Sequence, residues 1–240
     1  MSIRSVIRAF SVLDCFSFEA PRLTLHEICE KLELPKTTTF RLVHTLVDTG
    51  YLLQLDDQRY CVSFRVLRLA PLVQSVLDIR DVVRPELRIL AESTGETAAI
   101  SSLNGVERTY LDVVESSSRL KAVVSVGETV KLTKGSVSMV FLAFRPDLPF
   151  DEIFTDGDQP GTLAEELAEI RAKGHAFAAA DRVAGSAGLA APIFDLQDSC
   201  THVLSLSGPE VRMIEKRDEL AKTLMASAKK ISVRLGSAQQ

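Results

Sequence analysis

Residues 22–65 read RLTLHEICEKLELPKTTTFRLVHTLVDTGYLLQLDDQRYCVSFR, and this stretch decides the fold of the first part of the chain. Apolar residues recur at helical spacing in two short segments that are separated by Leu34-Pro35. The residue before a proline is pushed away from helical dihedrals, so the first segment should end there. Two alternating runs follow and predict a β-hairpin. The pattern therefore predicts a winged helix-turn-helix.

Local residues support both helices. Thr24 and Glu27 have the spacing of a capping box, in which each side chain satisfies an amide at the helix start. Pro35 suits the first turn of the second helix, where its missing N–H is not needed. We expect that helix to run to about Thr49, and Gly50 to provide a left-handed exit from it.

The second helix has two chemically different sides. Its apolar residues fall on one arc of the helix: Phe40, Leu42, Val43, Leu46 and Val47. Its polar residues fall on the opposite arc, with Lys36 at the amino-terminal end: Lys36, Thr37, Thr38, Arg41, His44 and Thr45. No carboxylate occurs before Asp48, at the far end of this helix.

Such a polar side fits a groove of DNA. Arginine can donate twice to a guanine edge, threonine methyls can contact thymine, and hydroxyls can donate to phosphate. The alternative is an ordinary amphipathic surface helix, since most solvated faces carry mixed polar residues. The absence of acids, the preceding turn and the following hairpin favour DNA binding.

The hairpin covers residues 51–64 and has the polar tip DDQR. A wing brings its tip to the phosphate backbone or the minor groove, and Arg59 and Arg65 are the candidate phosphate donors. Asp56 and Asp57 would repel phosphate, so the wing contact is the weaker half of the prediction.

Composition limits the possible partners. The 240 residues are 46% hydrophobic, enough for more than one core, so we expect two domains. Residues 1–70 hold nine Lys and Arg against eight Asp and Glu, and the remainder holds nineteen against twenty-four. DNA affinity must therefore come from a focal patch repeated in an oligomer.

Four scattered cysteines are expected to be buried reduced thiols rather than a disulfide or metal framework: Cys15, Cys29, Cys61 and Cys200. The sequence has no signal peptide and no apolar run of membrane-spanning length, so we expect a cytoplasmic protein. We expect no cofactor, no metal and no membrane partner.

The rest of the chain predicts an α+β arrangement. Residues 3–16 form an amphipathic first helix, and residues 64–79 look helical but contain Pro71, which should kink or break the helix. Further helices are expected at 82–94, 136–145, 160–173 and 210–235, the last with Val211 and Ile214 in its buried stripe. Strands are expected at 96–103, 106–114, 119–126, 186–194 and 201–207.

In this order of elements the chain resembles the isocitrate-lyase-regulator (IclR) family of bacterial transcription factors over nearly its full length. The spacing of LPKTTTFR and of LVDTGYL matches the family's DNA-binding part. GETVKLTKGSVSMVFLAF, GSAGLAAPIFD and HVLSLSGP follow in the order of the family's effector-binding part, a GAF-like sheet flanked by helices.

The resemblance implies a repressor or activator that binds a palindromic operator as a homodimer or as a homotetramer, and that responds to a small organic or aromatic acid. It implies a winged helix-turn-helix at 1–65, a linker helix at 66–80 and an effector-binding and oligomerisation domain at 81–240. It places the major-groove contacts on Lys36, Thr37, Thr38, Arg41, His44 and Thr45. It places the effector contacts on Leu132, Gly135, Met139, Asp181, Ser205 and Ser207.

Several positions depart from the family's pattern. Histidine is common where Thr133 stands, and Gly-Lys or Gly-Arg is usual where Ser138 and Met139 stand. Gly188 occupies a position where cysteine is frequent. The lost cation removes a partner for a carboxylate, which makes a neutral or larger ligand, or no ligand, an open alternative. Ser205 and Ser207 also fit ordinary alternation along a strand.

Two rival functions remain. A hydrolase could use Ser205 or Ser207 with His202 and Asp181, but the sequence lacks the G-x-S-x-G elbow of α/β-hydrolases. His202 also lies three residues from Ser205, so strand alternation points them to opposite faces. The other rival is an effector-independent DNA-binding regulator with a relic pocket.

Overall fold

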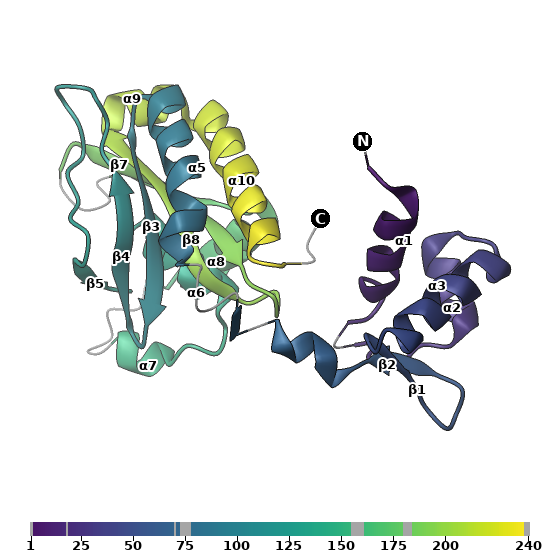
Figure 1. The fold of residues 1–240 in the computed structure, drawn as a ribbon. Coiled ribbons are helices and arrows are strands. Elements are labelled where there is room, and N and C mark those ends of the chain that lie inside the picture. The colour runs from purple at the N-terminus through teal and green to yellow at the C-terminus, as the bar shows by residue number, and fades with distance from the viewer. Residues whose placement is uncertain are drawn as a thin grey trace. The chain divides into compact units, whose positions relative to one another are not determined.

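The computed structural model describes residues 2–17, 19–69, 71–72, 78–154, 161–179 and 184–237. The chain divides into two compact units, residues 1–77 and residues 78–240, which we call the N-terminal unit and the C-terminal unit (Figure 1). Each unit has its own hydrophobic core.

The N-terminal unit contains the predicted helices and hairpin. Its elements are α1 (Arg4–Leu13), α2 (Leu25–Leu32), α3 (Lys36–Asp48), β1 (Leu52–Gln54), β2 (Tyr60–Val62) and the 3-10 helix η1 (Phe64–Arg68). β1 and β2 pair antiparallel, and Leu23 bridges to Tyr60, which ties the segment before α2 to the hairpin. The apolar sides of the three helices and the hairpin meet in one core: Val12, Leu23, Ile28, Val43, Leu46, Leu52 and Tyr60.

The predicted helix boundaries are confirmed by local contacts. The Thr24 hydroxyl accepts from the Glu27 amide, and the Glu27 carboxylate accepts from the Thr24 amide at 2.6 Å, which completes the capping box. α2 ends at Leu32 and Glu33 takes the left-handed conformation with a φ of 52°. Gly50 has a φ of 77°, so the chain leaves α3 through the left-handed turn that glycine favours.

One part of the predicted apolar arc of α3 is wrong. Thr39 is fully buried, whereas Phe40 is 47% exposed. Thr39 can be buried because its hydroxyl donates to the Pro35 carbonyl, which leaves its methyl group facing the core. Thr39, Val43 and Leu46 then form the buried stripe, and Phe40 lies at the border of the exposed side.

The C-terminal unit is a six-stranded antiparallel sheet with helices on both faces. Its strands lie in the order β5-β4-β3-β8-β7-β6. They are β3 (Thr97–Asn104), β4 (Glu107–Val114), β5 (Thr129–Lys131), β6 (Ala176–Ala179), β7 (Ser186–Phe194) and β8 (Cys200–Pro209). The helices are α5 (Ile79–Thr94), α6 (Ser136–Phe144), α7 (Phe150–Ile153), α8 (Leu163–Lys173), α9 (Glu210–Glu215) and α10 (Arg217–Arg234).

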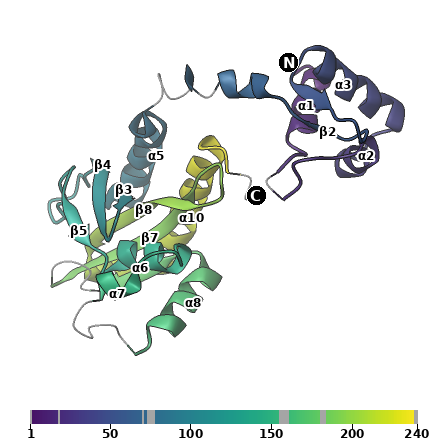
Figure 2. The same cartoon turned by 90° about the horizontal axis from the view of Figure 1, so that it is seen from below.

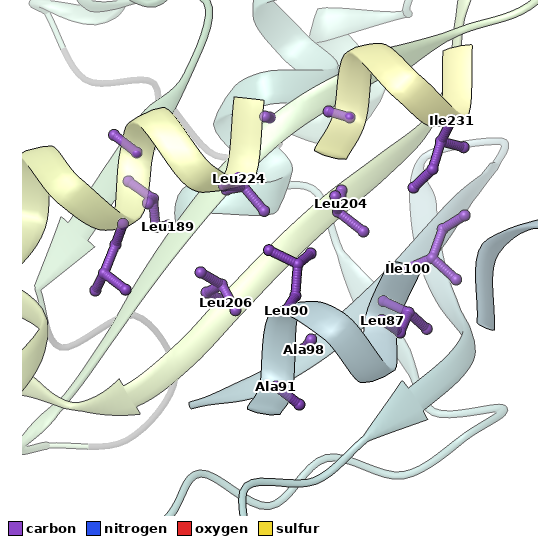
Figure 3. Packing of buried hydrophobic residues seen from close by; sticks show 14 of the residues in the cluster. Leu87, Leu90, Ala91, Ala98, Ile100, Leu189, Leu204, Leu206, Leu224 and Ile231 are labelled. Atoms are coloured by element: carbon purple, nitrogen blue, oxygen red, sulfur yellow. The ribbon is translucent and has the colours of Figure 1, made fainter. Parts of the chain in front are cut away.

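The two faces of the sheet have different covers. α5 and α10 lie side by side on one face, and α6 and α8 lie on the other (Figures 1 and 2). The larger core fills the space beneath α5 and α10, where leucines and isoleucines of these helices contact alternate residues of the strands (Figure 3). We call the face beneath α6 and α8 the second face of the sheet.

Two expectations for the C-terminal unit are wrong. Residues 119–126 form no strand, because their carbonyls bond to side chains: Thr97 donates to the Ala122 carbonyl at 2.7 Å, and Arg212 to the Leu120 carbonyl. The expected helix 210–235 breaks at Lys216 into α9 and α10, which leaves Val211 and Ile214 exposed. Strands β5 and β6 and helix α7 were not predicted, since segments of three or four residues are too short to show a period.

The structure describes only part of the expected connector between the two units. Residues 64–68 form η1, Pro71 and Leu72 are helical, and α5 begins at Ile79. Residues 73–77 of the predicted linker helix lie outside the described residues.

A buried ion pair joins α9 to the start of β3. Arg212 donates from Nε to Glu96 Oε1 at 2.7 Å and from Nη2 to Oε2 at 2.8 Å, and these hydrogen bonds raise the pKa of Arg212. Glu96 is only 3% exposed. Gly208 makes this possible, because a Cβ at that position would lie 2.1 Å from Glu96 Oε2.

Gly208→Ala should therefore destabilise the protein by about 1–3 kcal/mol, since the carboxylate of Glu96 must leave Arg212 while it stays buried. Urea unfolding measures this free energy. Gly161→Ala is the matched control, because no atom of the described residues lies within 4 Å of a Cβ at Gly161. Equal unfolding midpoints for the two variants would contradict the prediction.

Candidate nucleic-acid interface and ligand cavity

The exposed side of α3 gathers most of the predicted DNA-contact residues. Lys36, Thr37, Arg41 and Thr45 are exposed, and Thr38 and His44 are half-buried. Within the described part of the chain, neither Lys36 nor Arg41 takes part in an ion pair. The Thr45 hydroxyl donates to the Arg41 carbonyl at 2.7 Å, so the methyl group of Thr45 is left for outside contacts. The helix therefore presents free cations beside small side chains.

Three aromatic side chains, those of Phe40, His44 and Tyr60, lie beside the exposed side of α3. The ring centroids of Phe40 and His44 lie 4.1 Å apart, and those of His44 and Tyr60 lie 6.3 Å apart in an edge-to-face arrangement. His44 is thus packed between an exposed ring from its own helix and a buried ring from β2. This packing fixes the side-chain rotamers of Phe40 and His44, which sequence periodicity did not indicate.

Both predicted phosphate donors, Arg59 at the tip of the hairpin and Arg65 on η1, have a partner within the unit. Arg59 donates from Nε to Asp57 Oδ2 at 2.7 Å, and this hydrogen bond holds the pKa of Asp57 below its usual range. Arg65 donates from Nη1 to the Thr49 carbonyl at 2.6 Å and lies 5.0 Å from the centre of the Tyr51 ring. Arg65 therefore caps the carboxyl end of α3, where a cation is favoured by the helix dipole.

The predicted effector residues lie in different surroundings. Ser207 lines a cavity of about 410 Å³. Ser205 is buried, and its hydroxyl donates to the Ala99 carbonyl on β3. Leu132 and Met139 belong to the apolar cluster around α6, and Gly135 precedes the first turn of α6 with a φ of 91°. Asp181 lies outside the described residues.

The cavity has a mostly apolar wall with a few polar groups. One side is formed by the segment that crosses from β4 to β5, and the other by the β7–β8 end of the sheet. Its lining residues are Leu120, Lys121, Ala122, Val123, Val124, Ala184, Gly185, Ser186, Ala187, Ser207, Gly208 and Pro209.

The serine residues considered for hydrolysis do not meet a histidine in the described part of the chain. Leu204 and Leu206 face the core beneath α5 and α10, so alternation directs His202 to that face and Ser205 to the second face. His202 contacts Thr201, and burial lowers the pKa of His202. Ser205 uses its hydroxyl within the sheet.

The described residues hold no cluster of three or more His, Cys, Asp or Glu side chains that could bind a metal ion. Burial raises the pKa of the Cys200 thiol to about 12, which keeps it protonated. Among the helices that the structure describes, none is long and apolar enough to cross a membrane.

One buried cation was missed by the sequence analysis. Arg108 on β4 is 1% exposed, although arginine is rarely buried without a partner. The sequence ERTYLDVV gives no clear signal of this, because the polar residues of β4 show no regular alternation with apolar ones; only the structure places Arg108 and Tyr110 together on a covered face.

Two family models match the chain. The model described as "IclR helix-turn-helix domain" matches residues 5–56, and the model described as "Bacterial transcriptional regulator IclR C-terminal" matches residues 72–233. These ranges include α3 with its hairpin's first strand and nearly all of the C-terminal unit.

Individual proteins match over the same extent. The HTH-type transcriptional regulator BhcR of Paracoccus denitrificans is 30% identical over 96% of this chain and 86% of its own length. The transcriptional repressor IclR of Escherichia coli is 23% identical over 98% of this chain and 90% of its own length. The crystal structure of a candidate ICLR transcriptional regulator from a Silicibacter species has a TM-score of 0.89 at 25% identity, covering 100% and 98% of the two chains.

The contacts of Arg65 generate a stability prediction. Arg65→Met should lower the free energy of unfolding of the N-terminal unit by about 1 kcal/mol, because the Thr49 carbonyl loses a charged donor. Arg68→Met, on the same short helix with an exposed side chain, is the control. Thermal unfolding followed by circular dichroism compares the two, and an equal Tm for both variants would show that the cap contributes nothing.

Proposed function

Because the chain belongs to the IclR family of bacterial transcriptional regulators, as its motifs predicted, we propose that it binds a palindromic operator through α3 and that a small organic acid modulates this binding. The chain is a DNA-binding transcriptional regulator. The palindrome, the contacting residues, the effector and the assembly are proposals. A regulator works where the chromosome is, so we propose the cytoplasm as its location.

The observation that carries the DNA half is the exposed side of α3. It bears Lys36 and Arg41 without acidic partners, and its first carboxylate is Asp48. Thr37, Thr38, His44 and Thr45 complete the proposed major-groove contacts, with Arg41 as the residue that recognises guanine. Lys36 lies at the positive end of the helix dipole, which also favours a phosphate.

The wing supplies a smaller contribution in this proposal. Arg59 is exposed, and a phosphate could share its guanidinium with Asp57 at the hairpin tip. Arg65 contributes mainly by fixing the end of α3. Direct contact with phosphate from the wing is therefore assigned to Arg59.

A second copy of the chain is required for a palindrome, and α1 supports it. Ile3, Ile7 and Phe10 form a stripe on α1 and are 66%, 52% and 63% exposed. Exposed apolar stripes of this kind mark association surfaces. We propose a homodimer, or a dimer of dimers, in which residues 1–65 bind DNA, 66–80 connect and 81–240 bind the effector and oligomerise.

In this proposal, regulation depends on the distance between the two α3 helices of the dimer. Two half-sites can be bound together only when the separation of the two α3 helices matches the DNA repeat. A ligand that binds one arrangement of the C-terminal units more tightly would shift the population toward that arrangement. The separation of the two α3 helices would change with it.

The first test replaces Arg41. An operator is selected from a library of random duplexes, and affinity is measured by fluorescence anisotropy. Arg41→Ala should weaken binding by about 1–3 kcal/mol and relax preference at one base pair of each half-site. Arg88→Ala, an exposed position on α5, is the control. Unchanged affinity and selectivity of Arg41→Ala would refute the assignment of Arg41.

The second test concerns Phe40, whose exposed ring suits a thymine methyl group. Replacing thymine by deoxyuridine within the half-site should weaken wild-type binding by about 1 kcal/mol, the value of one buried methyl group. The same replacement should leave the affinity of Phe40→Ala unchanged. Thymines outside the half-sites serve as the control, and an equal loss in both proteins would exclude the contact.

A further inference from the structure

The second face of the sheet contains a buried positive charge without a counter-ion. Arg108 on β4 lies opposite Leu103 on β3 and Val130 on β5. Among the described residues, Arg108 Nε and Nη1 have no hydrogen-bond partner, and no carboxylate forms an ion pair with the guanidinium. Its recorded contact is the Tyr110 ring, whose centre lies 4.9 Å away.

The buried carboxylate of the same strand, Asp112, is already used. Asp112 lies on the opposite face, because an irregularity at Ile100/Ser101 shifts the register between Tyr110 and Asp112. Its Oδ1 accepts from Arg84 Nη1 at 2.6 Å. A buried guanidinium that lacks such a partner has lost its hydration without replacement, which is strongly unfavourable. An anion from outside the chain would restore the missing interactions.

A second buried group on the same face also lacks a partner. Ser101 on β3 pairs with Tyr110 on β4, and two residues further along β3, Leu103 pairs with Arg108. Ser101 and Arg108 are therefore diagonal neighbours on the same face of the two strands. Ser101 is fully buried, and its Oγ has no hydrogen-bond partner among the described residues. The guanidinium of Arg108 and the hydroxyl of Ser101 are therefore available to donate hydrogen bonds to the same ligand.

Tyr110 connects Arg108 to a buried apolar cluster that borders the cavity described above. Tyr110, which contacts the guanidinium, belongs to the same buried cluster as Val124 and Ala99. Val124 also lines the cavity, and Ser205, on the strand beyond β3, bonds to Ala99. Tyr110 thus lies between Arg108 and the side chain of Val124, whereas the cavity itself lies at the end of the sheet where Thr97 pairs with Ser207, six residues along β3 from the Leu103 pair with Arg108.

We propose that Arg108 is the anchor for a small organic carboxylate, whose two oxygens accept from one edge of the guanidinium, either Nε with Nη2 or Nη1 with Nη2, and that the Ser101 hydroxyl is an additional donor. This inference rests on the proposed function, in which a small acid modulates DNA binding. Arg108 replaces the cation that Met139 does not supply. Planar bidentate pairing with a carboxylate is the geometry that arginine provides best.

The experiment uses the full chain and thermal shift with defined probes: acetate, benzoate and succinate, each beside its amide, and inorganic phosphate. At least one carboxylate should raise the Tm of the wild type in a concentration-dependent manner, whereas its amide should not. Arg108→Met should abolish this shift. Arg108→Lys, which keeps the charge without the bidentate geometry, should raise the Kd by about tenfold or more. Ser101→Ala should raise it roughly two- to tenfold.

The ligand-free proteins separate a ligand anchor from a structural role. Because the buried charge of Arg108 has no internal partner, Arg108→Met should keep or raise the Tm of the ligand-free protein. Arg84→Met, which removes the α5 partner of Asp112 on β4, is the matched control, and it should lower the Tm by leaving Asp112 buried and unpaired. A Tm of Arg108→Met as low as that of Arg84→Met would assign Arg108 a structural role and overturn the proposal.

Other results would also overturn it. These are a wild type that responds equally to acids and amides, a response to phosphate alone, or a carboxylate shift that persists in Arg108→Met. Operator binding of the wild type is measured in parallel. Failure of the wild type to bind DNA would refute the proposed function, whereas intact operator binding with no carboxylate response would refute only this inference.

Discussion

Burial of Thr39, Val43 and Leu46 sets the rotation of α3 about its own axis, and the proposed chemistry of the N-terminal unit follows from that rotation. With these three residues against the core, Lys36 and Arg41 must point outward, because they lie on the other side of a helix with 3.6 residues per turn. The capping box fixes the start of α2, and the left-handed turn at Gly50 fixes the end of α3. The rotation therefore converts a pattern of residues into a surface that can bind DNA.

The C-terminal unit depends on a contrast between the two faces of one sheet. Beneath α5 and α10 the strands contribute leucine, isoleucine and alanine, which form a continuous apolar core. On the second face, the same strands bury Ser101, Arg108 and Ser205. Apolar packing is present on the second face as well, against α6 and α8. Under the proposed function, the polar groups buried on that face are retained for ligand binding.

Most of the fold could be predicted from the sequence, because its signals are local. The capping box of Thr24 and the turn at Gly50 each act within a few residues, and β7 and β8 are recognisable as an apolar run and an alternating run. The failures depend on tertiary contacts. Periodicity alone could not show that the Thr39 hydroxyl would find the Pro35 carbonyl, or that Phe40 would stack on His44 instead. The buried charge of Arg108 likewise depends on which strands become its neighbours.

Lysine footprinting tests the central claim most directly. The wild-type protein is acetylated with and without saturating operator, and the modification of each lysine is measured by mass spectrometry. The account predicts strong protection of Lys36 and unchanged reactivity of Lys222, which is exposed on α10. Equal acetylation of Lys36 in the free and the DNA-bound protein would show that α3 does not face the duplex.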